Sequence, residues 1–232
     1  MTWLLAIDTS TLTASAAVLD DDRVVVENQA ATTQHSEALL PLIDEVLRAA
    51  GLTPAQLDLL ACGAGPGSFT GLRIGLATAK GLCFALGKPL LAVSSLAALA
   101  LEAEALAPGG LVLSLMDARR GEVYAGLFRL RGDDAPEPLI EEAVFTPAAI
   151  VQLVRERAAG APVALVGDGV PVAPEIFAGI GSVPAGASAT PHGAAVGRIA
   201  RARFKAGAGD ELGTATPAYI RLAEAEVKFP PR

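Results

Sequence analysis

A run of glycine, proline and hydroxyl residues has the composition of an anion-binding turn. It extends from Gly65 to Gly75 and reads GPGSFTGLRIG. The apolar stretch Leu57 to Cys62 before it predicts a buried strand, and the stretch Leu72 to Leu86 predicts a helix. A glycine-rich turn between strand and helix places backbone N–H groups at the positive end of a helix dipole. Gly65 and Gly67 are therefore candidate cofactor-binding residues.

The same run has a purely structural interpretation. No Gly-Lys-Ser or Gly-Lys-Thr is present, so the run is not a P-loop. A tight turn by itself would also explain Gly65 and Gly67, and turns are the commoner use of glycine and proline. The spacing leaves both interpretations open.

Two aspartates follow strand-like runs. Asp8 ends the run Trp3 to Ile7, and Asp117 ends the run Leu111 to Met116. Short polar side chains at such positions hydrogen-bond the local backbone and form turns. We favour this role over a catalytic one for both aspartates.

Other chemistry is weakly represented. A catalytic metal needs about three protein ligands, whereas the chain has two histidines, His35 and His192, far apart in sequence. Cys62 and Cys83 lie in apolar runs and are interpreted as core thiols. Ser36 follows His35, but adjacent residues on a helix point to different sides, so they form no catalytic pair. We predict no catalytic residue and no metal site.

Composition limits the function further. The chain has 232 residues, is 52% hydrophobic and carries a net charge of −7, which disfavours stand-alone nucleic-acid binding. One basic cluster contrasts with this charge, and we interpret it as a solvated helix face: Arg198, Arg201, Arg203 and Lys205. No apolar run reaches the length needed to span a bilayer, and no charged segment precedes the first strand, so we expect a cytoplasmic protein without membrane contact.

The elements that position these residues repeat. Strand, aspartate, turn and strand occur near residues 3–19 and again near residues 111–130. Pro108-Gly109-Gly110 lies between the two copies, so we expect one lobe over residues 1–108 and a second over 109–232. Hairpins followed by alternating helices and strands predict an α/β fold with mixed sheets.

Two helices of the first lobe carry patterned faces. A helix near Ser36, with that residue as a plausible N-cap, has an apolar stripe at Leu39, Ile43 and Leu47, interrupted by Pro41. The helix after Thr70 has small residues at Gly71 and Gly75. Such a face allows another backbone to approach closely, whether from a partner or from the protein's own sheet.

These residues together resemble the bacterial TsaB (YeaZ) family over almost the whole chain. The run from Gly65 to Gly75 is the most specific part of the resemblance. The other matching segments are Ile7-Asp8-Thr9-Ser10, His35-Ser36-Glu37, Leu40-Pro41, Lys80-Gly81-Leu82, Asp117-Ala118-Arg119, Gly121-Glu122-Val123-Tyr124, Gly167-Asp168-Gly169, Pro217, Tyr219 and Arg221.

The resemblance implies an actin-like ASKHA (ribonuclease H-like) fold and a role in tRNA modification. It implies a non-catalytic partner of the TsaD-type catalytic subunit, which works with a TsaE-type ATPase. Together they form threonylcarbamoyladenosine beside the anticodon of tRNAs that read codons beginning with A. The tRNA would be contacted through the complex, and the chain alone is expected to form a homodimer.

The resemblance also implies where contacts lie. In ASKHA kinases the first hairpin approaches phosphate, which adds Asp8 and Ser10 to the candidate cofactor-binding residues. That hairpin lacks the kinase glycine here, so weak ATP or ADP binding, at the interface of the complex or in the partner, stays open. The expected partner interface comprises Leu39, Ile43, Leu47, Gly71, Ile74, Gly75, Thr78 and Leu82.

Two other functions compete. An ATP-dependent small-molecule kinase would need a base and a metal–phosphate site, for which Asp8 and Asp117 are the only good candidates. A peptidase would need a nucleophile with a base, or a metal, and the sequence shows no credible set.

Overall fold

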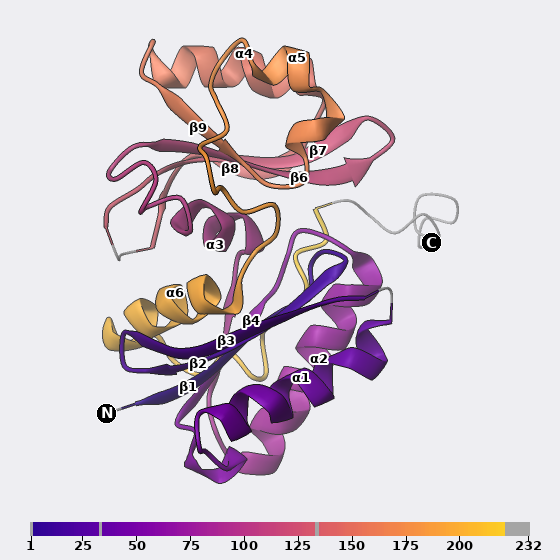
Figure 1. Ribbon diagram of the computed structural model, residues 1–232, viewed down its shortest axis with the longest axis vertical. Coiled ribbons are helices and arrows are strands. Elements are labelled where there is room, and N and C mark those ends of the chain that lie inside the picture. Colours follow the sequence, from indigo (N-terminus) through magenta and orange to yellow (C-terminus); the bar gives the residue numbers. More distant parts are fainter. Residues whose placement is uncertain (1, 33, 133–134, 221–232) are drawn as a thin grey trace.

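The structure is a computed structural model that describes residues 2–32, 34–132 and 135–220. It contains two mixed β-sheets, each covered by helices on both faces (Figure 1). The ASKHA-type α/β fold expected from the sequence is therefore present.

The first sheet has the strand order β3-β2-β1-β4-β5. The hairpin strands pair antiparallel, and β4 and β5 add to β1 in parallel. Helices α1 and α2 pack together on one face of this sheet. The elements are β1 (Trp3–Asp8), β2 (Thr13–Asp20), β3 (Arg23–Ala31), α1 (His35–Ala49), a 3₁₀ turn (Pro54–Gln56), β4 (Leu59–Gly63), α2 (Phe69–Leu86), β5 (Leu90–Val93) and α3 (Ser95–Leu101).

The second sheet has four strands in the order β8-β7-β6-β9 and repeats the arrangement of β3, β2, β1 and β4. Again two strand pairs are antiparallel, and β9 joins β6 in parallel. The predicted internal repeat thus corresponds to two sheets of equivalent construction. The elements are β6 (Leu111–Arg119), β7 (Glu122–Arg129), β8 (Glu137–Phe145), α4 (Pro147–Ala158), β9 (Val163–Val166), a 3₁₀ turn (Val170–Val172), α5 (Pro174–Phe177) and α6 (Gly193–Lys205).

Helices α3 and α6 lie between the two sheets (Figure 1). Helix α3 precedes the Pro108-Gly109-Gly110 segment but packs mainly on the second sheet, through Leu96 and Leu99. Helix α6 belongs to the second half of the sequence but packs on β1 and β2, through Val196 and Ile199. Each half of the chain therefore contributes one helix to the seam between the sheets, while the division at residues 108 and 109 stays a prediction.

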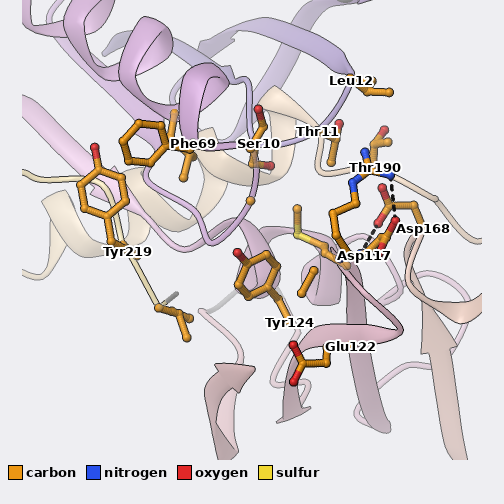
Figure 2. A pocket seen from close by; sticks show the side chains of 18 of the residues that line it. Ser10, Thr11, Leu12, Phe69, Asp117, Glu122, Tyr124, Asp168, Thr190 and Tyr219 are labelled. Carbon is orange, nitrogen blue, oxygen red and sulfur yellow. Dashed lines mark hydrogen bonds and ion pairs between the residues drawn. The ribbon is translucent and has the colours of Figure 1, made fainter. Parts of the chain in front are cut away.

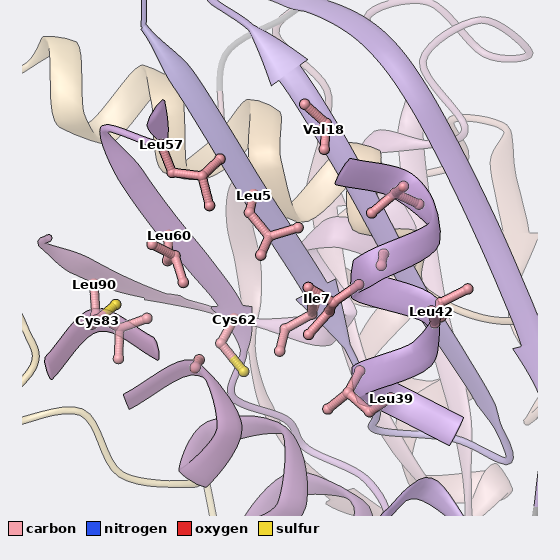
Figure 3. Close-up of a cluster of buried hydrophobic side chains, with 14 of the residues drawn as sticks. Leu5, Ile7, Val18, Leu39, Leu42, Leu57, Leu60, Cys62, Cys83 and Leu90 are labelled. Atoms are coloured by element: carbon pink, nitrogen blue, oxygen red, sulfur yellow. The ribbon is translucent and has the colours of Figure 1, made fainter. Parts of the chain in front are cut away.

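The core of the first sheet follows the period-two alternation of its strands. Leu5 and Ile7 face α1 and α2, whereas Leu4 and Ala6 face α6. Figure 3 shows Leu5 and Ile7 in the same cluster as Leu39 of α1, which is 1% exposed. The amphipathic stripe of α1 is thus buried against the sheet of this lobe.

Most local expectations are confirmed, with three corrections. Helix α1 begins at His35 and has Pro41 inside it, so Ser36 is not its N-cap. The strand β8 was not expected, because its residues 137–145 mix acidic and apolar types without alternation. Thr190-Pro191 is a typical start of a helix in the sequence, but helix α6 begins at Gly193 with His192 as its N-cap.

Candidate functional site

A cleft of about 950 Å³ opens between the two sheets and is lined from both lobes. The β1–β2 hairpin contributes Ser10 to Thr13, and the β6–β7 hairpin contributes residues 116–120 with Glu122 and Tyr124. The remaining lining residues are Gly67, Ser68, Phe69, Leu72, Asp168, Thr190, Ala218, Tyr219 and Ile220 (Figure 2). The two hairpins predicted from the sequence therefore face the same cavity.

Asp8 does not reach this cleft, contrary to its place among the candidate cofactor-binding residues. It is 0% exposed, and its Oδ1 accepts hydrogen bonds from the backbone N–H (2.7 Å) and hydroxyl (2.6 Å) of Ser10. Its Oδ2 accepts from the hydroxyl of Ser95 at 2.7 Å. Burial raises the pKa of Asp8, and these hydrogen bonds partly offset that rise. The carboxylate organises the hairpin, as the turn-former interpretation predicts.

The glycine run places Gly67 in the cleft but not Gly65. Gly65 exchanges hydrogen bonds with Ser95 in the interior, through both its N–H and its carbonyl. A Cβ on Gly67 would lie 2.2 Å from the carbonyl oxygen of Ser10, so a close approach of the hairpin explains this glycine. Among the first amides of α2, the N–H of Ser68 donates to Ser10 and the N–H of Gly71 donates to the Ser68 hydroxyl.

The second hairpin carries backbone strain at the rim of the cleft. Arg119 and Arg120 have φ values of 66° and 58°, a left-handed conformation that costs non-glycine residues roughly 1–2 kcal/mol each. Asp117 supports the turn, since its Oδ1 accepts from the N–H of Arg119 at 2.7 Å and its Oδ2 lies 3.0 Å from the Arg119 guanidinium. Asp117 is thus also a turn former, and its own N–H donates to Asp168.

The mouth of the cleft is aromatic. The guanidinium of Arg73 lies 3.8 Å from the centroid of the Phe69 ring, and the Phe69 and Tyr219 rings are 5.1 Å apart. The Arg73 Nε–H donates to the Tyr219 hydroxyl at 2.8 Å. This stack joins the last described residues to the start of α2. Arg221, part of the family resemblance, lies outside the described residues.

Sequence reasoning missed a second polar cluster, formed by Ser188, His192, Glu102 and Glu27. The His192 Nε2 is 3.0 Å from the Ser188 hydroxyl, and its Nδ1 is 3.4 Å from Glu102 and 3.6 Å from Glu27. This serine–histidine–carboxylate order resembles a hydrolase triad. The Ser188 hydroxyl, however, donates to the carbonyl of Thr190 at 2.7 Å, so its proton is directed away from the ring. The contacts span 90 residues between His192 and Glu102, which no local pattern could reveal.

The predicted interface residues divide into two groups. Leu39, Ile43 and Leu47 lie in the core, and Gly71 and Gly75 face Thr9 of the first hairpin. These five residues are buried, so they cannot form a contact surface in this fold. The sequence could not reveal this, because packing on the protein's own sheet produces the same amphipathic pattern as packing on a partner. Ile74, Thr78 and Leu82 are half-buried along α2.

The basic cluster of α6 is not the solvated face that the sequence predicts. Arg201 is buried and pairs with Asp21, Arg203 pairs with Glu211 and Lys205 with Asp22, so three of its four cations are engaged within the fold. Burial raises the pKa of Cys83 to about 12 and that of Cys62 still further. Over residues 2–32, 34–132 and 135–220, no group of three or more His, Cys, Asp or Glu side chains is placed to hold a metal.

Comparisons with known proteins match most of the chain. The family model for TsaD, tRNA N6-adenosine threonylcarbamoyltransferase, matches residues 24–228. The Bacillus subtilis tRNA threonylcarbamoyladenosine biosynthesis protein TsaB is 32% identical over 97% of both chains. The Haemophilus influenzae protein of the same name is 44% identical over 52% of this chain and 51% of its own.

Solved structures show the same relationship. A Pseudomonas aeruginosa protein described as similar to the peptidase YeaZ superposes with a TM-score of 0.83 at 33% identity, covering 95% of this chain and all of its own. YeaZ from Pseudomonas aeruginosa gives 0.77 at 32% identity, with 94% and 100% covered. An activator of 2-hydroxyisocaproyl-CoA dehydratase from Clostridium difficile, at 0.51 and 9% identity over 88% of this chain and 95% of its own, shares the fold alone.

Proposed function

Because the chain belongs to the TsaB family of tRNA threonylcarbamoyladenosine biosynthesis proteins, we propose that it is the non-catalytic partner of a TsaD-type subunit. It would act with a TsaE-type ATPase in the cytoplasm, where threonylcarbamoyladenosine is formed beside the anticodon of tRNAs that read codons beginning with A. The tRNA would be bound by the complex rather than by this chain alone.

The observation that carries the proposal is the outer face of α2. This helix is long and apolar enough to span a bilayer by length and composition, contrary to the expectation from the sequence, and only a third of it is buried. Its inner side packs on β4 and on the first hairpin. A protein partner is a more consistent neighbour than lipid, because Arg73 and Lys80 lie within the helix.

The composition of this face suits a helix–helix contact. Ala77 and Gly81 are exposed and four residues apart, so they lie on one side of the helix and present little bulk. Phe84, one turn further, is 84% exposed, and Leu40 of α1 is 55% exposed. A close-approach centre with large apolar anchors beside it is typical of stable interfaces. We call Ile74, Ala77, Thr78, Gly81, Leu82 and Phe84 the α2 face.

The basic residues support an indirect role in tRNA binding. Three of the four cations in the α6 cluster are occupied by ion pairs inside the fold. A stand-alone nucleic-acid binder needs several accessible cations on one surface. We therefore assign the contact with tRNA to the assembled complex.

The test is reconstitution. The chain is co-expressed with the TsaD-type subunit of the same cell, and the complex is purified through a tag on that subunit. Modified adenosine is then measured by mass spectrometry with tRNA, the ATPase and threonylcarbamoyl-adenylate present. We expect product only when both the chain and the TsaD-type subunit are supplied. Turnover by the chain alone, in a preparation free of the catalytic subunit, would overturn the proposal.

The alternative, an ATP-dependent small-molecule kinase, has one structural observation in its favour. The cleft lies between the lobes and, at about 950 Å³, has room for a nucleotide. Against it, Asp8 is buried and bonded to three protein groups. Phosphorylation of a panel of sugars by the pure chain, lost on Asp117→Ala, would favour the kinase.

A further inference from the structure

The chain crosses between the two sheets twice, and the two crossings meet at one pair of side chains. Residues 102–110 lead from α3 to β6, and residues 183–192 lead back to α6. Glu102 begins the first crossing and His192 ends the second. The His192 backbone N–H donates to Glu102 Oε1 at 2.7 Å, and the His192 Nδ1 lies 3.4 Å from Glu102 Oε2.

The contacts of the His192 ring favour its protonated form. When the Ser188 hydroxyl donates to the carbonyl of Thr190, its oxygen is left to accept from Nε2 of His192. On the other side, Nδ1 faces two carboxylates, which also only accept when ionised. With the Ser188 oxygen on one side and the carboxylate of Glu27 on the other, these contacts favour the imidazolium form of His192.

The surrounding charges support this state. The contact with Glu27 raises the pKa of His192, with burial opposing the rise and the negative charges of Glu102 and Asp8 adding to it. Burial raises the pKa of Glu102 to about 7. Burial would also raise the pKa of Glu27, but its contact with His192 and the N–H of Ala194 outweigh that effect and hold the pKa below its ordinary value.

The cluster is connected to the cleft. Thr190, between Ser188 and His192 in sequence, lines the cleft wall. Its carbonyl and its N–H both bond the Ser188 hydroxyl, which in turn accepts from His192. A change at the ring is therefore transmitted to the wall through two hydrogen bonds. The α2 face lies on the opposite side of the first sheet from α6, so this device is separate from the proposed pairing surface.

We propose that His192, Glu102 and Glu27 form a proton-controlled latch on the hinge between the lobes. With the imidazolium present, the two crossings are clamped to each other and to β3, and the Thr190 wall is fixed. A neutral ring can donate from one nitrogen only, so it must release either Ser188 or the carboxylates. Loss of the proton therefore loosens the hinge, while the bond from the His192 backbone N–H to Glu102 remains.

The experiment uses the two histidines of the whole chain, which give two separate ring signals in NMR. A titration of the wild-type protein follows both rings, while hydrogen exchange followed by mass spectrometry is measured over residues 102–110 and 183–192. We expect the His192 midpoint above the ordinary value of about 6.5. Exchange protection of both crossings, corrected for the intrinsic pH dependence, should fall through that same midpoint. Unchanged protection across the titration, or a midpoint at or below the ordinary value, would overturn the latch.

Two variants sharpen the result. His192→Gln should abolish the pH-dependent step in the protection of both crossings, and Glu102→Gln should shift the His192 midpoint downward. The same step persisting in folded His192→Gln would contradict the proposal. If His192→Gln does not fold, the wild-type titration and the midpoint shift in Glu102→Gln test the proposal without it. The His35 ring is the internal control, since its Nε2 contacts Thr11 in the first hairpin instead.

Discussion

Ser95 and Asp8 are 87 residues apart in sequence, yet a hydrogen bond of 2.7 Å joins the Ser95 hydroxyl to Asp8 Oδ2, and both residues are completely buried. The bond ties the first turn of α3, in the seam between the sheets, to the end of β1. It also occupies an oxygen of a carboxylate that does not line the cleft.

Replacement of Asp8 should therefore affect stability rather than binding. Asp8→Ala leaves the hydroxyls of Ser10 and Ser95 without their acceptor, and an unsatisfied buried donor costs about 1–3 kcal/mol. We expect the free energy of unfolding in urea to fall by about 2–4 kcal/mol. Asp44→Ala, at an exposed carboxylate paired within α1, is the control and should change it by less than about 0.5 kcal/mol. Equal stability of the two variants would contradict the structural role of Asp8.

Nucleotide affinity of the isolated chain should be weak or absent. The Asp8 carboxylate faces Ser95, and no charged side chain of the first hairpin lines the cleft in the described part of the chain. Titration calorimetry with ATP and magnesium should show no sub-micromolar binding. Tight binding that is lost on Asp117→Ala or Asp168→Ala would instead favour the kinase alternative.

Gly75 and Gly81, both on α2, offer a matched pair of substitution sites, one buried and one exposed. A Cβ at Gly75 would lie 2.2 Å from the Thr9 hydroxyl, whereas a Cβ at Gly81 meets nothing within 4 Å. We expect Gly75→Arg to destabilise the fold by about 3 kcal/mol or more, because neither Thr9 nor the helix backbone can yield. Gly75→Arg is thus unsuitable as a test of pairing, although Gly75 is among the interface residues expected from the sequence.

Gly81→Arg should leave the fold intact and weaken pairing. Replacing an exposed helical glycine removes a penalty of roughly 1 kcal/mol, but a charged side chain then stands in the centre of the α2 face. Size-exclusion with light scattering, alone and with the TsaD-type subunit, measures the loss, and circular dichroism verifies folding. If folded Gly81→Arg pairs as tightly as the wild type, the interface does not include this helix.

The aromatic stack at the cleft mouth should anchor residues 217–220. Tyr219→Phe keeps the ring beside Phe69 and loses the bond from Arg73, whereas Tyr219→Ala loses both. The amide of Ala218, which donates to Ala64 at 2.7 Å, reports the anchoring through hydrogen exchange. We expect the exchange rate of this amide to rise about two- to fivefold in the alanine variant, because an exposed cation–π contact contributes about 0.5–1 kcal/mol. The rise should be smaller in the phenylalanine variant. Identical rates in all three proteins would show that the stack anchors nothing.

Stability should decline as pH rises from 6 to 9. A histidine whose pKa is raised by folding stabilises the fold fully below about 6.5, and that contribution is lost as pH rises through the folded value. Glu102 acts in the same direction, because burial raises its pKa to about 7 and its ionisation in the folded protein therefore costs stability as pH rises. Urea unfolding at pH 6 and pH 9 should show a smaller difference for His192→Gln than for the wild type. An equal difference in both proteins would exclude His192 as the cause.

The sequence alone determined what depends on near neighbours along the chain. Short apolar runs specified β1, β2, β6 and β7, and the aspartates at the strand ends specified the turns, because these signals act within a few residues. The glycine run and its flanks specified the strand–turn–helix around Gly67. The same residues carried the family resemblance that the comparisons confirm.

Tertiary structure decided which surfaces those elements present. The stripe at Leu39, Ile43 and Leu47 is identical in pattern whether it faces its own sheet or a partner, since apolar burial has no directional preference for either. The meeting of His192 with Glu102, and of Asp8 with Ser95, required α3 and α6 to be placed between the sheets. Contacts at such separations depend on how layers pack, and no spacing along the chain encodes that packing.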